Sequence, residues 1–173
     1  MKFTIAHSPD SDDAYMMAPL ALGWLDEDPD RAGFDLDFIR KDIEQLNQEA
    51  LLGLYEVTAI SFGAYPELRD RYELLTAGSS IQEGTGPVVV ARRPYRPEDL
   101  AGVTVAIPGV RTSAYLALQK WRQGLAVTIL PFDQILAAVA EGRCEAGLLI
   151  HESQLLYQDL GLHLVVDLGA WWK

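Results

Sequence analysis

Residues 104–130 read TVAIPGVRTSAYLALQKWRQGLAVTIL and alternate between two kinds of hydrophobic pattern. A short β-branched run at 104–107 predicts a buried strand, residues 112–123 predict an amphipathic helix, and residues 127–130 predict a second strand. A strand, a helix and another strand in succession form the unit from which parallel sheets are built. This stretch therefore indicates an α/β protein.

The same alternation continues through the rest of the chain. We expect further strands at residues 3–7, 34–39, 57–60, 73–77, 88–91, 146–150 and 162–166, and further helices at 14–22, 65–71 and 132–140. Asp42 is predicted to cap another helix, with Gln45 three residues later and Gly53 just past its end. The acidic and apolar alternation at 34–39 indicates a half-exposed edge strand, whereas the continuous apolar run at 88–91 should be covered on both faces.

One segment interrupts this alternation with prolines and charges. It reads RRPYRPEDLAG and covers residues 92–102, directly after the apolar run at 88–91. Prolines and charge clusters of this kind are typical of connections between domains. The sequence therefore predicts two α/β lobes, residues 1–94 and residues 95–173, with a boundary near Pro94.

The composition argues against several classes of protein. The chain of 173 residues is 49% hydrophobic and 23% charged, which is typical of a globular fold, and its formal net charge is −11. Most of the acidity lies in residues 1–60, which hold 13 acidic against 4 basic residues. Such a surface repels nucleic acid and anionic lipid, so neither is an expected partner, although a small anion can still bind at a helix N-terminus.

The sequence also gives no sign of export or of a metal site. Cys144 is the single cysteine, so neither an intramolecular disulfide nor a site of several thiolates can form. No apolar run approaches the ~18 residues of a membrane span, and the start of the chain lacks the apolar region of a secretory signal. We therefore expect a cytoplasmic protein without a metal or another cofactor.

The acidic run Asp10-Ser11-Asp12-Asp13 has two interpretations. Its spacing resembles the start of a calcium loop, but the glycine and the closing glutamate of an EF-hand are missing. Acidic side chains are also favourable in the first turn of a helix, whose N-terminus carries partial positive charge. We expect these residues to cap and charge the helix that follows.

Hydroxyl and imidazole side chains recur where predicted strands give way to helices. They are His7, Ser8, Ser61, Thr112, Ser113 and His151. Ligands of open parallel sheets bind outside the carboxyl ends of the strands, so these side chains are expected to meet in a cleft between the lobes. Each has a structural alternative, because Ser and Thr are common N-caps and a lone histidine is often structural. The residues alone leave open whether the cleft binds or reacts.

Six segments, taken together, resemble one enzyme family. They are HSPDSDDAY (7–15), AISFGAYP (59–66), GPVVVARRP (86–94), VAIPGVRTSAYLAL (105–118), EAGLLIHES (145–153) and VVDLGAWW (165–172). In this order, and over essentially the whole chain, they closely resemble the 1,4-dihydroxy-6-naphthoate synthases of menaquinone biosynthesis. The combination of IPG-x-x-T-[ST]-AY with IHES is specific for this family, whereas any single fragment would be weak evidence.

The resemblance implies a fold and a site. The fold is periplasmic-binding-protein-like type II, with two α/β lobes joined by crossover strands, and the activity is that of a lyase acting on cyclic dehypoxanthinylfutalosine, a small-molecule substrate. The histidine of the family's I-H-E-[SG] segment is the proposed proton acceptor, and it corresponds to His151. Substrate contacts would fall on Ala59, Ile60, Ser61, Ser113 and Ala114, and Asn47 matches a polar residue that faces the family's cleft. Ser61, Ser113 and His151 are thus indicated both by position and by resemblance.

Two further expectations follow from the resemblance. Family members continue beyond the DLGAWW segment with a portion that completes the first lobe. We expect either that this sequence is a piece of a longer protein or that the completing portion is missing. Two rival functions use the same fold, namely a solute-binding protein and the chorismate dehydratase of the same pathway. The expected cytoplasmic location argues against the first rival, and the HSPDSDDAY and IHES segments argue against the second.

Overall fold

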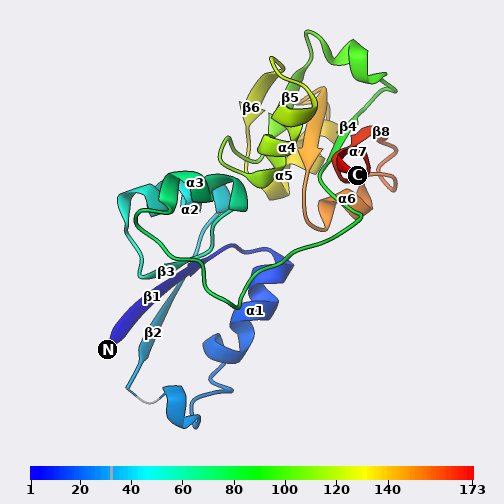
Figure 1. Cartoon of the computed structure of the whole chain (residues 1–173). Helices are drawn as coiled ribbons and strands as arrows, with labels where there is room; N and C mark the ends of the chain where they lie inside the picture. Colours follow the sequence, from blue (N-terminus) through cyan, green and yellow to red (C-terminus); the bar gives the residue numbers. More distant parts are fainter. Residues whose placement is uncertain (32) are drawn as a thin grey trace. The chain divides into compact units, whose positions relative to one another are not determined.

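The computed structural model describes residues 1–31 and 33–173, and it contains two compact units, Met1–Ser80 and Ile81–Lys173 (Figure 1). Each unit has its own β-sheet and its own hydrophobic core. This is the α/β architecture that the alternating patterns predict. Among the described residues, no helix has the length and apolar character needed to cross a membrane.

The first unit is built on a three-stranded sheet in the order β2-β1-β3. Strand β1 spans Lys2–His7, β2 spans Asp35–Arg40 and β3 spans Val57–Thr58, and both neighbours run parallel to β1. Strand β2 lies at the edge, where its acidic residues are exposed and its apolar residues are half-buried. The prediction of a half-exposed edge strand is confirmed.

The helices of the first unit begin and end where the sequence supplies caps. They are α1 (Ser11–Ala21), α2 (Ile43–Leu52) and α3 (Tyr65–Leu68), together with the 3-10 turns η1 (Pro29–Arg31) and η2 (Phe62–Ala64). The Asp42 carboxylate accepts a hydrogen bond from the Glu44 N–H at 2.9 Å, and Gly53 ends α2 in the left-handed region with φ 68°. Both predicted caps of α2 are confirmed, because a carboxylate satisfies an open N–H and glycine takes a positive φ without strain.

One predicted strand of the first unit does not form. Residues 73–77 have no regular secondary structure, and Leu74 and Leu75 are exposed by 46% and 71%. The prediction of a strand at 73–77 assumed that these apolar side chains are buried. They are exposed, so the assumption fails here. The buried core of this unit consists instead of two small groups, Ala6 with Leu46 and Tyr55, and Ala50 with Ala64 and Leu68.

The second unit is built on a five-stranded mixed sheet in the order β6-β5-β7-β4-β8. Its strands are β4 (Val88–Ala91), β5 (Thr104–Ile107), β6 (Ala126–Ile129), β7 (Ala146–Leu149) and β8 (His163–Asp167). Strands β6 and β7 run parallel to β5, whereas β4 runs antiparallel to both β7 and β8. Its helical segments are η3 (Pro97–Leu100), α4 (Ser113–Trp121), α5 (Phe132–Ala140), α6 (Ser153–Leu156) and α7 (Leu168–Trp172).

Both faces of this sheet are covered. Val89 and Ala91 of β4 pack in one cluster with Leu118 of α4, while Val88 and Val90 pack in a second cluster with residues of α5. Successive side chains of a strand point to opposite faces, so a strand that is apolar at every position needs two layers of cover. All four residues of β4 are buried, as the continuous run at 88–91 predicts.

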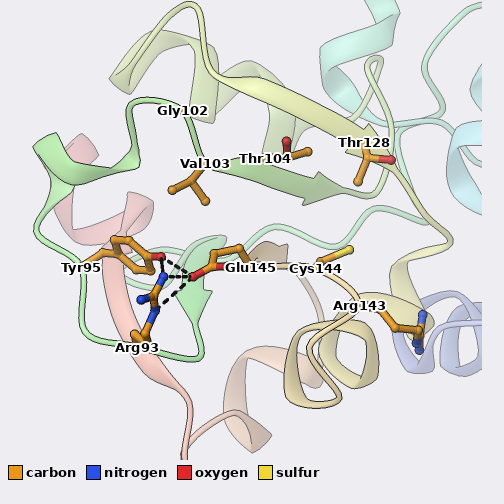
Figure 2. A pocket seen from close by; sticks show the side chains of 9 residues that line it. All are labelled: Arg93, Tyr95, Gly102, Val103, Thr104, Thr128, Arg143, Cys144 and Glu145. Carbon is orange, nitrogen blue, oxygen red and sulfur yellow. Dashed lines mark hydrogen bonds and ion pairs between the residues drawn. The ribbon is translucent and has the colours of Figure 1, made fainter.

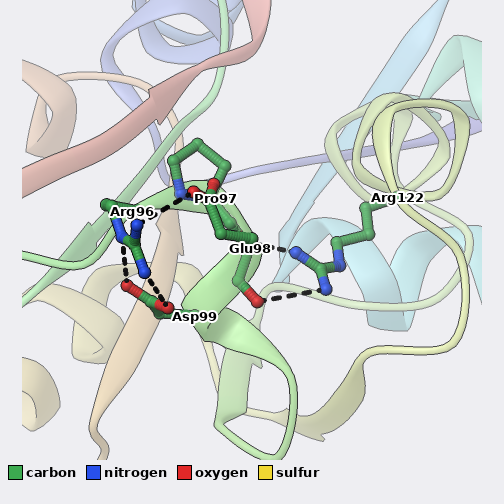
Figure 3. A network of polar contacts seen from close by, with 5 residues as sticks. All are labelled: Arg96, Pro97, Glu98, Asp99 and Arg122. Carbon is green, nitrogen blue, oxygen red and sulfur yellow. Dashed lines mark hydrogen bonds and ion pairs between the residues drawn. The ribbon is translucent and has the colours of Figure 1, made fainter.

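The predicted boundary near Pro94 is wrong. The compact units divide between Ser80 and Ile81, and β4 pairs in the sheet of the second unit, so residues 81–94 belong with the residues that follow them. The segment after β4 is not a linker because Arg93 and Arg96 form ion pairs and Leu100 is fully buried. Arg96 pairs with Asp99 at 2.9 Å, and Arg122 at the end of α4 donates to the carbonyls of Pro97 and Glu98 (Figure 3).

Gly147 in β7 allows a close approach between α5 and the sheet. A Cβ atom at this position would lie 2.6 Å from a methyl carbon of Ile135 and 2.8 Å from one of Val139. Both residues of α5 are fully buried in the second cluster. The absence of a side chain at Gly147 therefore determines how closely α5 packs on β7, the strand that ends just before His151.

Candidate functional site

His151 lies two residues beyond the carboxyl end of β7 and has an unusual backbone. Its φ angle is 51°, and among the described residues it is the one non-glycine with a positive φ. A residue with a Cβ atom is strained there by about 1–2 kcal/mol, and such outliers persist where the surroundings hold them, often at functional sites. The His151 carbonyl accepts a hydrogen bond from the Gln154 N–H at 3.2 Å, which ties this turn to the start of α6.

The half-buried imidazole of His151 is in contact with an aromatic ring that the sequence interpretation did not single out. The ring centroids of Phe132 and His151 lie 5.2 Å apart, with an interplanar angle of 61°. Phe132 begins α5 and is only 5% exposed. The signal that could have found it is its position directly after Pro131, at another strand-to-helix junction of the same sheet.

The N-terminus of α4 contains three of the hydroxyl and small residues that the sequence indicates. Thr112 is the N-cap, since its Oγ1 accepts from the Tyr115 N–H at 3.2 Å and donates to the Gly109 carbonyl at 2.8 Å. Ser113 is exposed at the first helical position, whereas the Ala114 side chain is buried in the core. Ala114 can therefore offer a ligand its backbone N–H but not its methyl group.

Ser113 and His151 follow neighbouring strands. Strands β5 and β7 pair in parallel, so the turns that leave their carboxyl ends start from the same edge of the sheet. This edge is where the topology of the second unit places both residues.

In the first unit, Asn47 and Ser61 form a paired contact. The Asn47 side chain is fully buried, its Oδ1 accepts from the Ser61 N–H at 2.8 Å, and its Nδ2 donates to the Ser61 Oγ at 3.2 Å. Ser61 precedes the η2 turn but makes no side-chain cap there. The structural alternative for Ser61, a simple cap, therefore does not apply, and the amide of Asn47 holds the Ser61 backbone and hydroxyl together.

The residues before Ser61 continue directly from β3. Ala59 donates its N–H to the carbonyl of Ala6 in β1 at 2.8 Å, and both Ala59 and Ile60 are half-buried. Strands β1 and β3 are parallel neighbours. The 59–61 segment and the His7-Ser8 turn thus leave the same edge of the three-stranded sheet.

The acidic run after β1 forms a chain of caps. The Asp10 carboxylate accepts from the Asp13 N–H at 2.9 Å as the N-cap of α1, and the Asp13 carboxylate accepts from the buried Ser8 N–H at 2.7 Å. Asp12 and Asp13 lie in the first turn, where negative charge is favourable. The prediction that these residues cap and charge the helix is confirmed.

A concavity of about 520 Å³ lies elsewhere in the second unit and involves none of the predicted site residues (Figure 2). Thr104 at the start of β5 and Glu145 just before β7 help to line it, so it lies at the amino ends of these strands. Glu145 accepts hydrogen bonds from Tyr95 and Arg93, and these bonds lower the pKa of its carboxyl. The main charged side chains that line this concavity thus already have partners. The candidate residues Ser113 and His151 lie at the opposite, carboxyl ends of β5 and β7.

Two units, each with its own sheet and with polar residues after the strand ends, define a class of two-unit α/β proteins. Solved structures of similar fold support this assignment. The Xanthomonas axonopodis alkanesulfonate-binding protein SsuA superposes with a TM-score of 0.69 at 14% identity, covering 96% of this chain and 60% of that one. An Archaeoglobus fulgidus protein of known crystal structure superposes with a TM-score of 0.89 at 42% identity, covering 99% of this chain and 62% of that one. The fold is that of the periplasmic solute-binding proteins, as expected.

Comparisons of the amino-acid sequence assign the chain to a family. The profile of the family described as "Menaquinone biosynthesis" matches residues 3–173, so the chain belongs to this family. A Thermus thermophilus relative named 1,4-dihydroxy-6-naphtoate synthase is 41% identical over 98% of the chain, and a Streptomyces coelicolor relative of the same name is 34% identical over 98%. The chain spans 60% of the length of each of these relatives.

Proposed function

We propose that this chain carries the reacting residues of a carbon–carbon lyase that converts cyclic dehypoxanthinylfutalosine to 1,4-dihydroxy-6-naphthoate. The observation that carries the proposal is the combination of 41% identity to a relative of that name with a left-handed histidine at the end of β7. A strained backbone at a strand end is where a reacting side chain is often held.

His151 is the proton acceptor in this proposal. Imidazole is the side chain most often used as a general base near neutral pH. It removes a proton from a hydroxyl group or a ring carbon of the substrate, and cleavage of a carbon–carbon bond follows. Formation of the aromatic naphthalene system favours this cleavage, and the sugar-derived carbons leave as dihydroxyacetone. The chemistry needs neither a metal nor another cofactor.

Two groups of residues bind the substrate in this proposal. At α4, the Ser113 hydroxyl and the N–H groups of the first turn suit a carboxylate, because the N-terminus of a helix carries partial positive charge. In the first unit, Ala59, Ile60 and Ser61 present backbone and hydroxyl groups at the end of β3. Asn47 acts through Ser61, since both polar atoms of its amide bond to that residue.

A product assay tests the proposal against its two rivals. The purified protein is incubated separately with cyclic dehypoxanthinylfutalosine and with chorismate, and the products are identified by mass spectrometry. We expect 1,4-dihydroxy-6-naphthoate from the first substrate and no enol-ether product from the second. Dehydration of chorismate would assign the protein to the sister enzyme. Tight binding of either compound without turnover would favour a binding protein.

A further inference from the structure

His7 is a buried histidine of the first unit that the proposed reaction does not use. It is the last residue of β1 and is only 6% exposed. Its Nδ1 lies 2.9 Å from the Ser8 carbonyl oxygen, and its ring lies 6.4 Å from the ring of Phe38 between centroids. Among the described residues, no other group forms a hydrogen bond or an ion pair with this imidazole. Within that part of the chain, the second ring nitrogen, Nε2, therefore has no partner.

The contact with Ser8 determines which ring nitrogen of His7 carries a proton. A carbonyl oxygen can only accept a hydrogen bond, so Nδ1 must donate to it. In a neutral imidazole the other nitrogen, Nε2, then has a lone pair and is an acceptor. A buried acceptor without a partner is unfavourable, and such atoms are normally bonded to an ordered water or to a ligand. Nε2 thus calls for a donor that the described part of the chain does not supply.

The turn that anchors the ring is itself fixed by hydrogen bonds. Ser8 is fully buried, and its N–H donates to the Asp13 carboxylate at 2.7 Å. The Asp13 N–H in turn donates to the carboxylate of Asp10, the N-cap of α1, at 2.9 Å. The position of Nε2 therefore depends on β1 and on the start of α1, not on a mobile side chain. A fixed acceptor of this kind suits the recognition of one particular ligand group.

The strand register places His7 beside the segment that is proposed to bind substrate. Ala6 pairs with Thr58 of β3, and the Ala59 N–H donates to the Ala6 carbonyl at 2.8 Å. His7 is one residue further along β1, so it is level with the residues that follow β3. Ligands of parallel sheets bind outside the carboxyl ends of the strands, which is where both segments lie.

The ring of His7 lies on the face of this sheet that is opposite α2. Ala6 packs against Leu46 of α2, and successive side chains of a strand point to opposite faces. Ser61, in contrast, is bonded to Asn47 of α2. A ligand at the carboxyl edge of the sheet can therefore be contacted from both faces, by Ser61 on the side of α2 and by His7 on the other side.

From this arrangement we infer that His7 binds a hydroxyl group of the substrate through Nε2. The inference rests on the proposed function, since His7 and the 59–61 segment would then contact the same molecule. A hydroxyl group can donate to a neutral imidazole nitrogen, and the carbons that leave as dihydroxyacetone carry such groups. The role is recognition and not proton transfer. Loss of Nε2 therefore weakens binding and leaves the chemical step to His151.

Two substitutions separate the two nitrogens of the His7 ring. His7→Asn places an amide N–H close to the position of Nδ1, so it keeps the bond to the Ser8 carbonyl and loses Nε2. His7→Gln places an amide group close to the position of Nε2, so it keeps an acceptor there and loses the bond to Ser8. His163→Asn, at an exposed position of the second unit, is the control. Each change is made in the His151→Asn variant, which should lack turnover, so that calorimetry measures the affinity for cyclic dehypoxanthinylfutalosine directly.

We expect His7→Asn to weaken substrate binding about tenfold, which corresponds to about 1.4 kcal/mol, with a thermal midpoint near that of its background. His7→Gln should show the reverse, a lower thermal midpoint with affinity within about threefold. His163→Asn should change neither quantity. If His7 serves only to hold the turn, His7→Asn keeps both stability and affinity, and that result would overturn the inference.

NMR of the imidazole nitrogens gives a second measurement that does not depend on stability. At pH 8, where imidazole is ordinarily neutral, Nε2 of His7 should give the signal of an unprotonated nitrogen, and substrate should shift it. The chain has three histidines, and the variants assign their signals. A protonated Nε2, or a signal that stays unchanged while calorimetry detects binding, would leave a bound water as its only partner and refute the inference. A wild-type protein that does not bind the substrate would instead refute the proposed function, while the spectrum would still report the tautomer of His7.

Discussion

The two units place their candidate residues in the same way but stabilise them differently. In both, the residues follow the carboxyl ends of parallel neighbouring strands. The sheet of the second unit is covered on both faces, whereas the first unit has three strands and two small buried groups, and α1 contributes no buried residue. Strand topology thus places the candidate residues, while the cover on the sheet determines how firmly they are held.

The largest effect is expected at His151, the residue of the second unit that has a positive φ without being glycine. His151→Asn keeps similar size and hydrogen bonding, and asparagine tolerates a positive φ better than most residues. Asparagine is not basic near neutral pH, so turnover should fall by roughly 10²–10⁴-fold, the usual contribution of a general base, while the fold is kept. Steady-state kinetics and circular dichroism measure both outcomes.

A comparison of substitutions separates strain from chemistry at the same position. His151→Gly removes the Cβ atom that makes the positive φ unfavourable, so it should be more stable than His151→Ala. Both should lack turnover. A folded His151→Asn protein with a near wild-type rate would remove His151 from the mechanism and return it to a structural role.

The difference between the two cores can be measured with a matched pair of cavities. Leu46→Ala in the first unit and Leu148→Ala in the second both remove a fully buried leucine, and such changes typically cost 2–5 kcal/mol. We expect Leu148→Ala to lie at the upper end, because the doubly covered sheet leaves little room for neighbours to collapse into the cavity. Leu46→Ala should fall at the lower end.

Hydrogen exchange locates the damage from each cavity. Leu46→Ala should increase exchange in β1 and β3 while β4 and β7 stay protected, since each unit has its own core. An equal loss of protection in both units would show that they unfold together and would break the comparison.

A smaller effect is expected from the amide that holds Ser61. Asn47→Ala leaves the Ser61 N–H without its partner and removes a donor to the Ser61 hydroxyl, so it should cost about 1–3 kcal/mol in stability. Ser61→Ala removes only the hydroxyl, for about 0.5–1.5 kcal/mol. Substrate affinity, measured by calorimetry, should fall in both variants, and the double variant should lose less than the sum because the residues act as one unit. Additive losses would indicate that Asn47 contacts the substrate independently of Ser61.

Much of this arrangement could be predicted from sequence because it depends on local patterns. The caps at Asp10 and Asp42, the stop at Gly53 and the doubly covered strand at 88–91 each follow from a few neighbouring residues. The junction residues Ser61, Ser113 and His151 follow from strand ends in the same way.

The features that sequence did not predict depend on residues that are distant along the chain. The boundary was misplaced because Arg93 pairs with Glu145, Arg96 pairs with Asp99, and Arg122 donates to the carbonyls of η3, none of which the local pattern can reveal. The antiparallel direction of β4 and the ring contact of Phe132 with His151 likewise depend on tertiary pairing. Local patterns report whether a residue is covered, but not which residue covers it.

The smallest expected effect is a pH dependence that arises from one carboxyl of the first unit. Burial would raise the pKa of the Glu49 carboxyl, but hydrogen bonds from Lys41 and Tyr55 outweigh it and hold that pKa below its ordinary value of 4.5. A carboxyl whose pKa is lower in the folded state stabilises the fold above its ordinary pKa and loses that contribution as the pH falls through the folded value. The first unit should therefore lose stability below about pH 4.5, by no more than about 1 kcal/mol, because the pair is partly exposed.

Urea unfolding between pH 3 and pH 7 tests this contribution with Glu49→Gln and, as a control, Glu73→Gln at an exposed position of the same unit. Glu49→Gln should lower stability at pH 7 and flatten the loss on acidification, since glutamine neither titrates nor attracts the Lys41 ammonium. Glu73→Gln should follow the wild-type profile. If the two variants give the same profile, the Lys41–Glu49–Tyr55 contacts do not stabilise the first unit.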